Sequence, residues 1–182
     1  MTETTKLKPL EPEPTVEHIQ KFNSGDLNDL CDATDAAIEG GGGFGWIVLP
    51  VRDVLERYWQ GVLTMPRREL FVARLDGVIC GTCQLLKPPP NNEAQSFAVN
   101  LTTNFVTPWA RGHGLAKMLI KAAEKQAVSE GFEVINLDIR ETLESAMALY
   151  ECMGYRRIGE HPRYAKIDGS VLKGYYYCKM IG

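Results

Sequence analysis

Hydrophobic and polar positions repeat along the chain with two different periods, one typical of helices and one of strands. The apolar positions of residues 51–63 follow the i, i+3, i+4, i+7 spacing of an amphipathic helix over three turns. Similar stripes predict helices at 27–38, 114–129 and 144–153. Ser24 or Asp26 is a suitable cap for the first of these, and the run Gly40–Gly43 is expected to end it.

Strand patterns lie between these helices. Residues 69–75 and 78–86 flank Asp76-Gly77, a dipeptide typical of a tight hairpin turn. Along 97–106, one face carries Phe97, Val99, Leu101, Thr103 and Phe105, and the other carries Asn100, Thr102 and Asn104. Further strands are expected at 16–22, 134–139, 155–159 and 172–180. This order predicts an α/β (α+β) fold with helices on both faces of a central sheet.

Composition favours a single globular domain. The 182 residues are 45% hydrophobic and 24% charged, and no apolar run approaches the roughly 20 residues of a membrane span. We expect a flexible, polar, proline-rich tail at 1–14 without a secretory signal, and one domain at 15–182. The net charge of −3 comes from scattered residues, so neither nucleic acid nor a membrane is expected as a partner.

The cysteines and histidines do not suggest a metal site. Five irregularly spaced cysteines are typical of a reduced, cytoplasmic setting. Cys80 and Cys83 form an isolated CxxC inside a strand pattern, which predicts that their side chains point to opposite faces. His18 and His161 lack partners at metal-ligand spacing, so no metal is expected.

The segment 105–116 is the strongest candidate for chemistry because it joins a strand to an amphipathic helix through two glycines. Gly112 and Gly114 would allow a ligand to approach backbone N–H groups, and the start of the helix adds unpaired donors. The combination predicts an anion site suited to a pyrophosphate. Leu115-Ala116 stands where a nucleotide P-loop needs Lys-Ser or Lys-Thr, and the dinucleotide fingerprint does not fit either. A glycine-rich turn without any ligand remains the alternative.

Two motifs of the chain together resemble the GNAT superfamily of N-acetyltransferases. Its Arg/Gln-x-x-Gly-x-Gly/Ala signature is matched by Arg111-Gly112-His113-Gly114-Leu115-Ala116. A second block, 136–140 followed by 146–155, is similar to the strand and short helix that end in Tyr-x-x-x-Gly-Phe/Tyr in that family. The resemblance is clear over roughly 69–182 and looser before it.

The resemblance implies a GNAT fold, with a mixed sheet of six to seven strands, and acetyl-CoA as co-substrate. It places the pantetheine arm in an opening between two parallel strands, beside the backbone of Phe105 and Val106. It also implies that Arg111, Gly112, His113, Gly114, Leu115 and Ala116 hold the pyrophosphate. Leu143 departs from the asparagine that many relatives have there, and Ser145 could replace its contact with the cofactor arm.

The resemblance also suggests catalytic roles. It places Tyr150 near the thioester sulfur as the proton donor to the leaving thiolate; a core tyrosine is the alternative. Many relatives carry a glutamate on the strand before the loop, but here that strand offers only amides and hydroxyls. Asp138 is the leading substitute base, directly or through water, unless it only holds a neighbouring residue. Asn100 could hold a water or orient the amine, and Glu93 and Glu141 are weaker candidates.

The acceptor side is expected at 40–46, Tyr58, Trp59 and the last strands, which would suit a small polar amine. The stretches 41–46 and 159–164 are similar to the tabtoxin-resistance acetyltransferases, which acetylate a small amino compound. Acetylation of a protein N-terminus or lysine is the second reading, and a CoA-binding sensor without catalysis is the third. An exposed edge strand near the C-terminus could pair with a second copy to form a homodimer.

Overall fold

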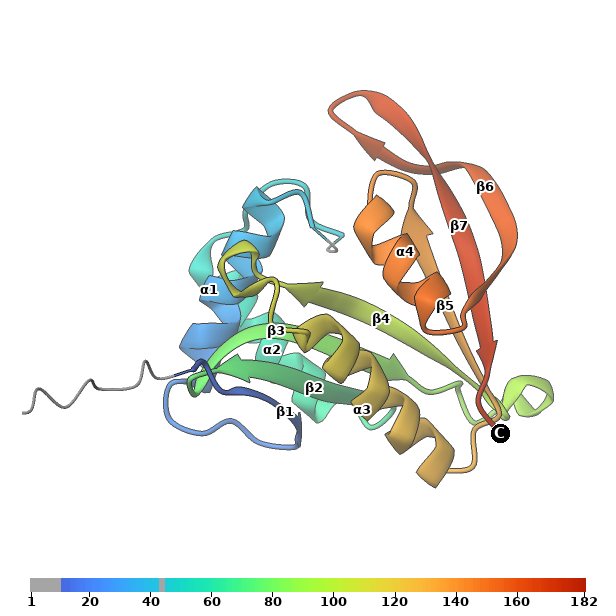
Figure 1. Ribbon diagram of the computed structural model, residues 1–182, viewed down its shortest axis with the longest axis horizontal. Helices are drawn as coiled ribbons and strands as arrows, with labels where there is room; N and C mark the ends of the chain where they lie inside the picture. The colour runs from blue at the N-terminus through green and yellow to red at the C-terminus, as the bar shows by residue number, and fades with distance from the viewer. Residues whose placement is uncertain (1–10, 43–44) are drawn as a thin grey trace, which may run out of the picture.

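The computed structural model describes residues 11–42 and 45–182; residues 1–10, 43 and 44, with part of the expected tail and of the acceptor wall, lie outside them. Figure 1 shows one sheet with helices against it. The strands are β1 (Pro14–Ile19), β2 (Arg68–Leu75), β3 (Val78–Leu86), β4 (Ala98–Val106), β5 (Val134–Arg140), β6 (Arg156–Ile167) and β7 (Ser170–Met180). The α-helices are α1 (Asp26–Glu39), α2 (Arg52–Thr64), α3 (Leu115–Ser129) and α4 (Glu144–Cys152).

The seven strands form one mixed sheet in the order β1-β2-β3-β4-β5-β7-β6, which confirms the predicted α/β architecture. Only β4 and β5 are parallel; all other neighbours are antiparallel. Asp76 and Gly77 turn the β2–β3 hairpin with positive φ values of 52° and 87°, as the dipeptide predicted. Strand β6 has 12 residues, far longer than the five expected, because it continues to the hairpin turn before β7.

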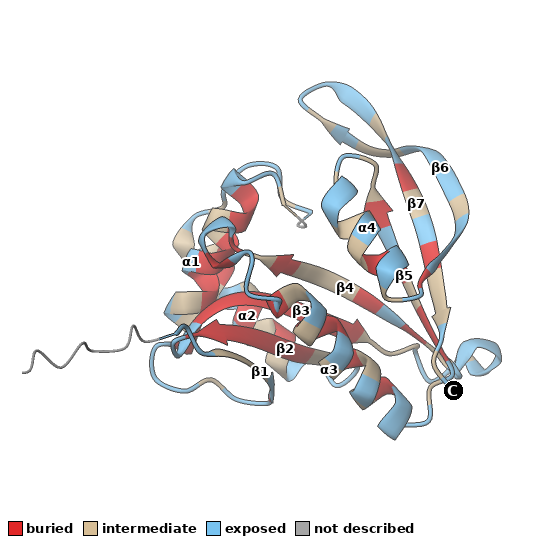
Figure 2. Cartoon of the chain, viewed as in Figure 1, coloured by how far each residue is buried: buried red, intermediate tan, exposed pale blue. Residues whose placement is uncertain are grey.

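Two hydrophobic cores lie on opposite faces of the sheet, so the prediction of helices on both faces is confirmed. Helix α3 packs on β1–β4, where Leu119, Ile120 and Ala123 are fully buried. Helices α1 and α2 cover the other face with Leu30 and Trp59. Figure 2 shows the buried positions concentrated in the central strands, whereas the β6–β7 hairpin is largely exposed. No helix of the described part of the chain is long and apolar enough to cross a bilayer.

Strand β4 does not alternate as its sequence predicts. Thr103 has a φ of 51°, and the pairing of β3 with β4 slips between Thr82 and Gln84. This bulge moves the following residues to the other face: Phe105 packs in the α1/α2 core, although Val99 and Leu101 pack in the α3 core. The expectation that these three share a face was therefore wrong.

The two cysteines of the CxxC pattern share a face, contrary to the prediction. The β2–β3 register slips at Cys80, because Ala73 pairs with Gly81 and Arg74 with Ile79. Cys80 and Cys83 consequently both lie in the α3 core, where each thiol faces a backbone carbonyl oxygen at 3.5 Å. Burial raises the pKa of the Cys80 thiol to about 11, so it stays protonated.

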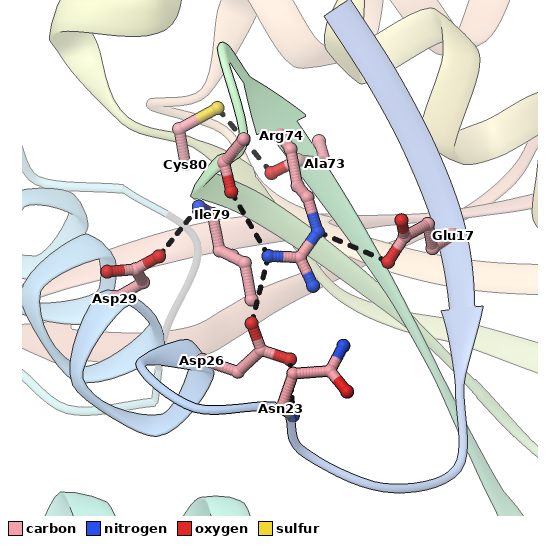
Figure 3. A network of polar contacts seen from close by, with 9 residues as sticks. Glu17, Asn23, Asp26, Asp29, Ala73, Arg74, Ile79 and Cys80 are labelled. Carbon is pink, nitrogen blue, oxygen red and sulfur yellow. Dashed lines mark hydrogen bonds and ion pairs between the residues drawn. The ribbon is translucent and has the colours of Figure 1, made fainter.

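The start of α1 is held by an ion-pair network instead of the predicted side-chain cap. Gly25 occupies the cap position, and Asp26 is the first helical residue. Its carboxylate accepts the Asn23 N–H and the Arg74 guanidinium, each at 2.9 Å, while Arg74 also pairs with Glu17 of β1 (Figure 3). Burial disfavours the charge of Asp26, but these hydrogen bonds outweigh it and lower its pKa. The network joins α1, β1 and the β2–β3 hairpin.

We expect Asp26→Asn to lower the free energy of unfolding by about 3 kcal/mol at neutral pH, because it leaves the buried Arg74 charge without its main partner. Since the folded pKa of Asp26 lies below its unfolded value, the stabilisation is complete above about pH 4 and is lost as pH falls through the folded pKa. Urea titrations at several pH values measure both effects. Asp53→Asn, on an exposed helix pair, is the control and should cost under about 1 kcal/mol.

Candidate active site

The central opening of the molecule is created where β4 and β5 separate. The two strands pair only from Ala98 with Val134 to Asn100 with Asn136. Beyond that point, they border a cavity of about 1280 Å³. Its walls come from β4, β5, the start of α4, the α1–α2 connection and the β6 end of the last hairpin. Among the described residues, no strand pairs with β5 on the β4 side beyond this point, so backbone groups of both strands can bond a ligand.

One end of the cavity is the predicted anion loop. Arg111 and Ala116 line the cavity, and the exposed turn between Arg111 and α3 contains Gly112 and Gly114 with φ values of 87° and 73°. Within the described chain, the backbone N–H groups of Gly112 to Ala116 donate to no backbone carbonyl. A Cβ atom placed on either glycine would meet nothing within 4 Å, so this side of the loop is open. The loop therefore presents a set of unpaired donors to a ligand.

Tyr150 is the most buried polar group of the cavity wall. It lies on α4 with 6% of its surface exposed, and its ring meets that of Tyr155 edge to face at 5.4 Å. Burial raises the pKa of Tyr150, although a hydrogen bond from the Asn104 side chain opposes this effect. Tyr150 is thus a protonated phenol at neutral pH and belongs to the cavity wall.

Asp138 lies across the cavity on β5 and is held by Tyr164, which was not predicted as its partner. The Tyr164 hydroxyl donates to Asp138 Oδ2, and both residues line the cavity. Tyr164 reaches it because β6 bulges between His161 and Ala165, which lets the Tyr164 ring lie directly over Gly174 of β7. Burial, followed by this hydrogen bond, raises the pKa of Tyr164. The pair fixes a carboxylate in the cavity that Tyr150 also lines.

Two aromatic residues and a hydrogen bond between Arg140 and Gly41 border the side of the cavity that lies towards α1 and α2. Trp46 and Tyr58 line it, their rings meeting edge to face at 5.1 Å. The buried Gln84 donates to the Tyr58 hydroxyl at 3.3 Å, which fixes its position. Across the opening, the Arg140 guanidinium donates to the Gly41 carbonyl oxygen at 3.4 Å.

Most of the predicted site residues meet at this cavity. Tyr150, Asp138, Phe105, Val106, Arg111, Ala116 and Ser145 all line it. Leu115 is 2% exposed because its side chain packs in the α3 core, and the His113 ring lies 3.2 Å from the Ala110 carbonyl oxygen. Asn100 is separate: it is exposed and borders a smaller pocket of about 280 Å³ with Asn136.

Sequence reasoning missed the contacts that orient the reactive side chains. Asn104 donates to the Tyr150 hydroxyl at 2.8 Å, yet the alternation of β4 had placed Asn104 beside Asn100. A threonine gives no signal for the positive φ that causes this change, because β-branched residues rarely adopt it. Gly174, by contrast, is a glycine within a strand pattern, which can mark close approach of another group.

Comparisons with known proteins agree on one family. The model of the acetyltransferase (GNAT) family matches residues 38–155. An uncharacterized N-acetyltransferase of the hisH-hisA intergenic region of Azospirillum brasilense is 60% identical over 128 residues, which cover 70% of this chain and 76% of the relative.

Solved structures show the same fold at low sequence identity. An N-acetyltransferase from Staphylococcus aureus Mu50 superposes with a TM-score of 0.79 and 16% identity, covering 93% of this chain and 99% of the other. A GNAT superfamily phosphinothricin acetyltransferase from Sinorhizobium meliloti, solved in complex with AcCoA, gives a TM-score of 0.76 and 19% identity, covering 93% and 89%.

We expect Gly174→Ala to displace Tyr164 and release Asp138, because the added Cβ would overlap the tyrosine ring. Such overpacking should lower the free energy of unfolding by about 1–3 kcal/mol. A crystal structure of the variant tests the displacement. Gly159→Ala on β6 is the matched control, since its Cβ would lie at an ordinary 3.5 Å from Tyr176. An undisturbed Tyr164–Asp138 bond in Gly174→Ala would contradict the packing argument.

Proposed function

The chain belongs to the GNAT family of acetyltransferases, and on that premise we propose that it transfers the acetyl group of acetyl-CoA to the amine of a small molecule. The observation that carries this proposal is a single cavity with a buried phenol, Tyr150, on one wall and a carboxylate, Asp138, on another. Transfer from a thioester to an amine needs one group that donates a proton and one that accepts a proton.

The residues present fit acetyl-CoA as the co-substrate. The open N–H groups of the turn at Gly112 and Gly114 suit a pyrophosphate, and Arg111 adds a positive charge beside them. Around Phe105 and Val106, β4 pairs with β3 on one side but not with β5 on the other, and its cavity-facing edge suits the amide groups of a pantetheine arm. An arm that follows β4 from the loop would bring its thioester towards Tyr150.

The two catalytic candidates then take complementary parts. Tyr150 gives its proton to the departing sulfur, since burial keeps the phenol protonated at neutral pH. Asp138 attracts the ammonium group of the acceptor and takes its proton, so that the amine lone pair can attack the carbonyl carbon. Tyr164 keeps the Asp138 carboxylate in place during this exchange.

The size and lining of the acceptor side favour a small amine. Trp46 and Tyr58 form its apolar wall, while Asp138 and Arg140 supply one negative and one positive group. The Arg140–Gly41 bridge and the Tyr164–Asp138 bond narrow the opening, which supports a compact acceptor over an extended peptide.

A thiol-release assay over a panel of small amines tests this function directly. We expect acetyl-CoA-dependent release of CoA with at least one small amine, and a matching acetylated product by mass spectrometry. Tyr150→Phe should bind CoA with unchanged affinity and lose about 10²-fold or more in kcat. If only peptides are acetylated, the acceptor is a protein and the proposed small-molecule acceptor is wrong. If the protein binds CoA but acetylates no amine or peptide, it is a CoA-binding sensor without catalytic activity.

We expect Asp138→Asn to lower kcat/KM for the amine by about 10²-fold, because the amide neither attracts the ammonium group nor takes its proton. The affinity for CoA should stay unchanged, as measured by calorimetry. Asp168→Asn, in the turn of the β6–β7 hairpin, is the control with the same loss of charge and should behave as the wild type. If Asp138→Asn keeps the wild-type kcat/KM, water and not this carboxylate accepts the proton.

A further inference from the structure

We propose that Asn104 is a positioning residue, whose side-chain amide turns the hydroxyl proton of Tyr150 into the cavity. The inference rests on the proposed role of Tyr150 as proton donor. It concerns a residue that the sequence had placed on the other face of β4, and it explains why an amide is present beside the phenol.

The geometry of the pair defines the direction of the phenol proton. Asn104 Nδ2 donates to Tyr150 Oη at 2.8 Å, so the phenol oxygen accepts along that line and its own proton must point elsewhere. Within the described part of the chain, no group accepts that proton from Tyr150, and both residues line the cavity. The Tyr150 ring itself is fixed by burial and by its edge contact with Tyr155. Since Tyr150 lines the cavity, a ligand bound there can supply the acceptor that this proton lacks.

The bulge of β4 brings the amide to this position. Without the positive φ of Thr103, regular alternation would leave Asn104 on the face of Asn100, away from α4. Its Oδ1 atom is buried and has no hydrogen-bond partner among the described residues, which is a costly arrangement for an amide. The positive φ of Thr103 and the unpartnered Oδ1 of Asn104 therefore both cost stability. The hydrogen bond to Tyr150 is the contact that this costly arrangement makes possible.

The amide also suits the charge that develops during transfer. As the amine nitrogen forms its bond to the carbonyl carbon and the carbon–sulfur bond breaks, Tyr150 gives its proton to the sulfur and becomes a phenolate. The Asn104 N–H stabilises this phenolate, in opposition to the burial that disfavours it. One proton of the acceptor's ammonium group leaves through Asp138 to solvent before attack. The nitrogen loses a second proton as the amide forms, and this proton returns to the Tyr150 phenolate through water, so that the net release is one proton.

Replacing the amide by a carboxylate of the same shape tests the proposal. In Asn104→Asp, the phenol would donate to the introduced carboxylate, and its proton would no longer face the sulfur. We expect kcat to fall by about 10²-fold at about pH 8, close to the loss in Tyr150→Phe. The double variant should lose no more than Tyr150→Phe alone, because both changes remove one function. The kcat of Asn104→Leu, which leaves the phenol without this hydrogen bond, should lie between the kcat of the wild type and that of Asn104→Asp.

Two further readouts separate positioning from a structural role. The ratio of wild-type to Asn104→Asp kcat should shrink as pH falls, because a protonated carboxyl group can donate to Tyr150 as the amide does. Raman difference spectra of the unliganded proteins should show one tyrosine change from accepting to donating a hydrogen bond. Asn91→Asp, on an exposed loop, carries the same charge change and should leave kcat and the spectra unchanged.

The outcomes distinguish this inference from the function on which it rests. If Tyr150→Phe retains wild-type kcat, the proton-donor role itself is wrong. If Tyr150→Phe is impaired but Asn104→Asp is not, the amide has the opposite orientation, with Oδ1 accepting the phenol proton, and the positioning role is overturned. The same holds if the double variant loses a further factor of ten or more, since the two residues would then act independently.

Discussion

The interruption of β4 is the constraint on which the site depends. The strand must pair with β3 from Asn100 to Val106 while it leaves β5 after Asn100. The left-handed Thr103 bends it away, at a conformational cost typical of functional sites. Gly81 makes the close contact of the two strands feasible, since a Cβ there would lie 2.7 Å from the Phe105 carbonyl oxygen. The bulge therefore opens the cavity, sends Phe105 into the α1/α2 core and directs Asn104 to Tyr150.

The part of this arrangement that could be predicted is the part encoded in local patterns. Asp76-Gly77 specified its hairpin, and the glycines of the 111–116 loop indicated a backbone anion site, because each of these backbone conformations has a residue type that favours it. Thr103 has no such signature, so the alternation of β4 gave the wrong face for Phe105 and Asn104. The Tyr164–Asp138 bond depends on a β6 bulge and on Gly174 of another strand, and no pattern within one segment could reveal it.

Two of the tyrosines that line the cavity, Tyr150 and Tyr164, show how the same residue type can have different roles. Burial raises the pKa of both Tyr150 and Tyr164, so each is a protonated donor at neutral pH. Their neighbours decide where the proton goes. An amide N–H faces Tyr150 and leaves its proton for the ligand, whereas a carboxylate faces Tyr164 and retains it. The first arrangement suits proton transfer, and the second suits holding Asp138 in place.

The proposed acetyl-CoA side of the site consists mainly of backbone groups, whereas the proposed acceptor side consists mainly of side chains. The proposed pyrophosphate and pantetheine contacts use backbone groups of β4 and of the turn before α3, which many side-chain changes would leave intact. The proposed acceptor side uses side chains from the α1–α2 connection, α2, the end of β5 and the β6–β7 hairpin. The hairpin is largely exposed, so substitutions there meet little packing resistance. Acetyl-CoA can therefore be inferred from fold and loop geometry. On the proposed function, the choice of amine would depend on Trp46, Tyr58, Arg140 and Tyr164, and a change in acceptor would be expected at these positions.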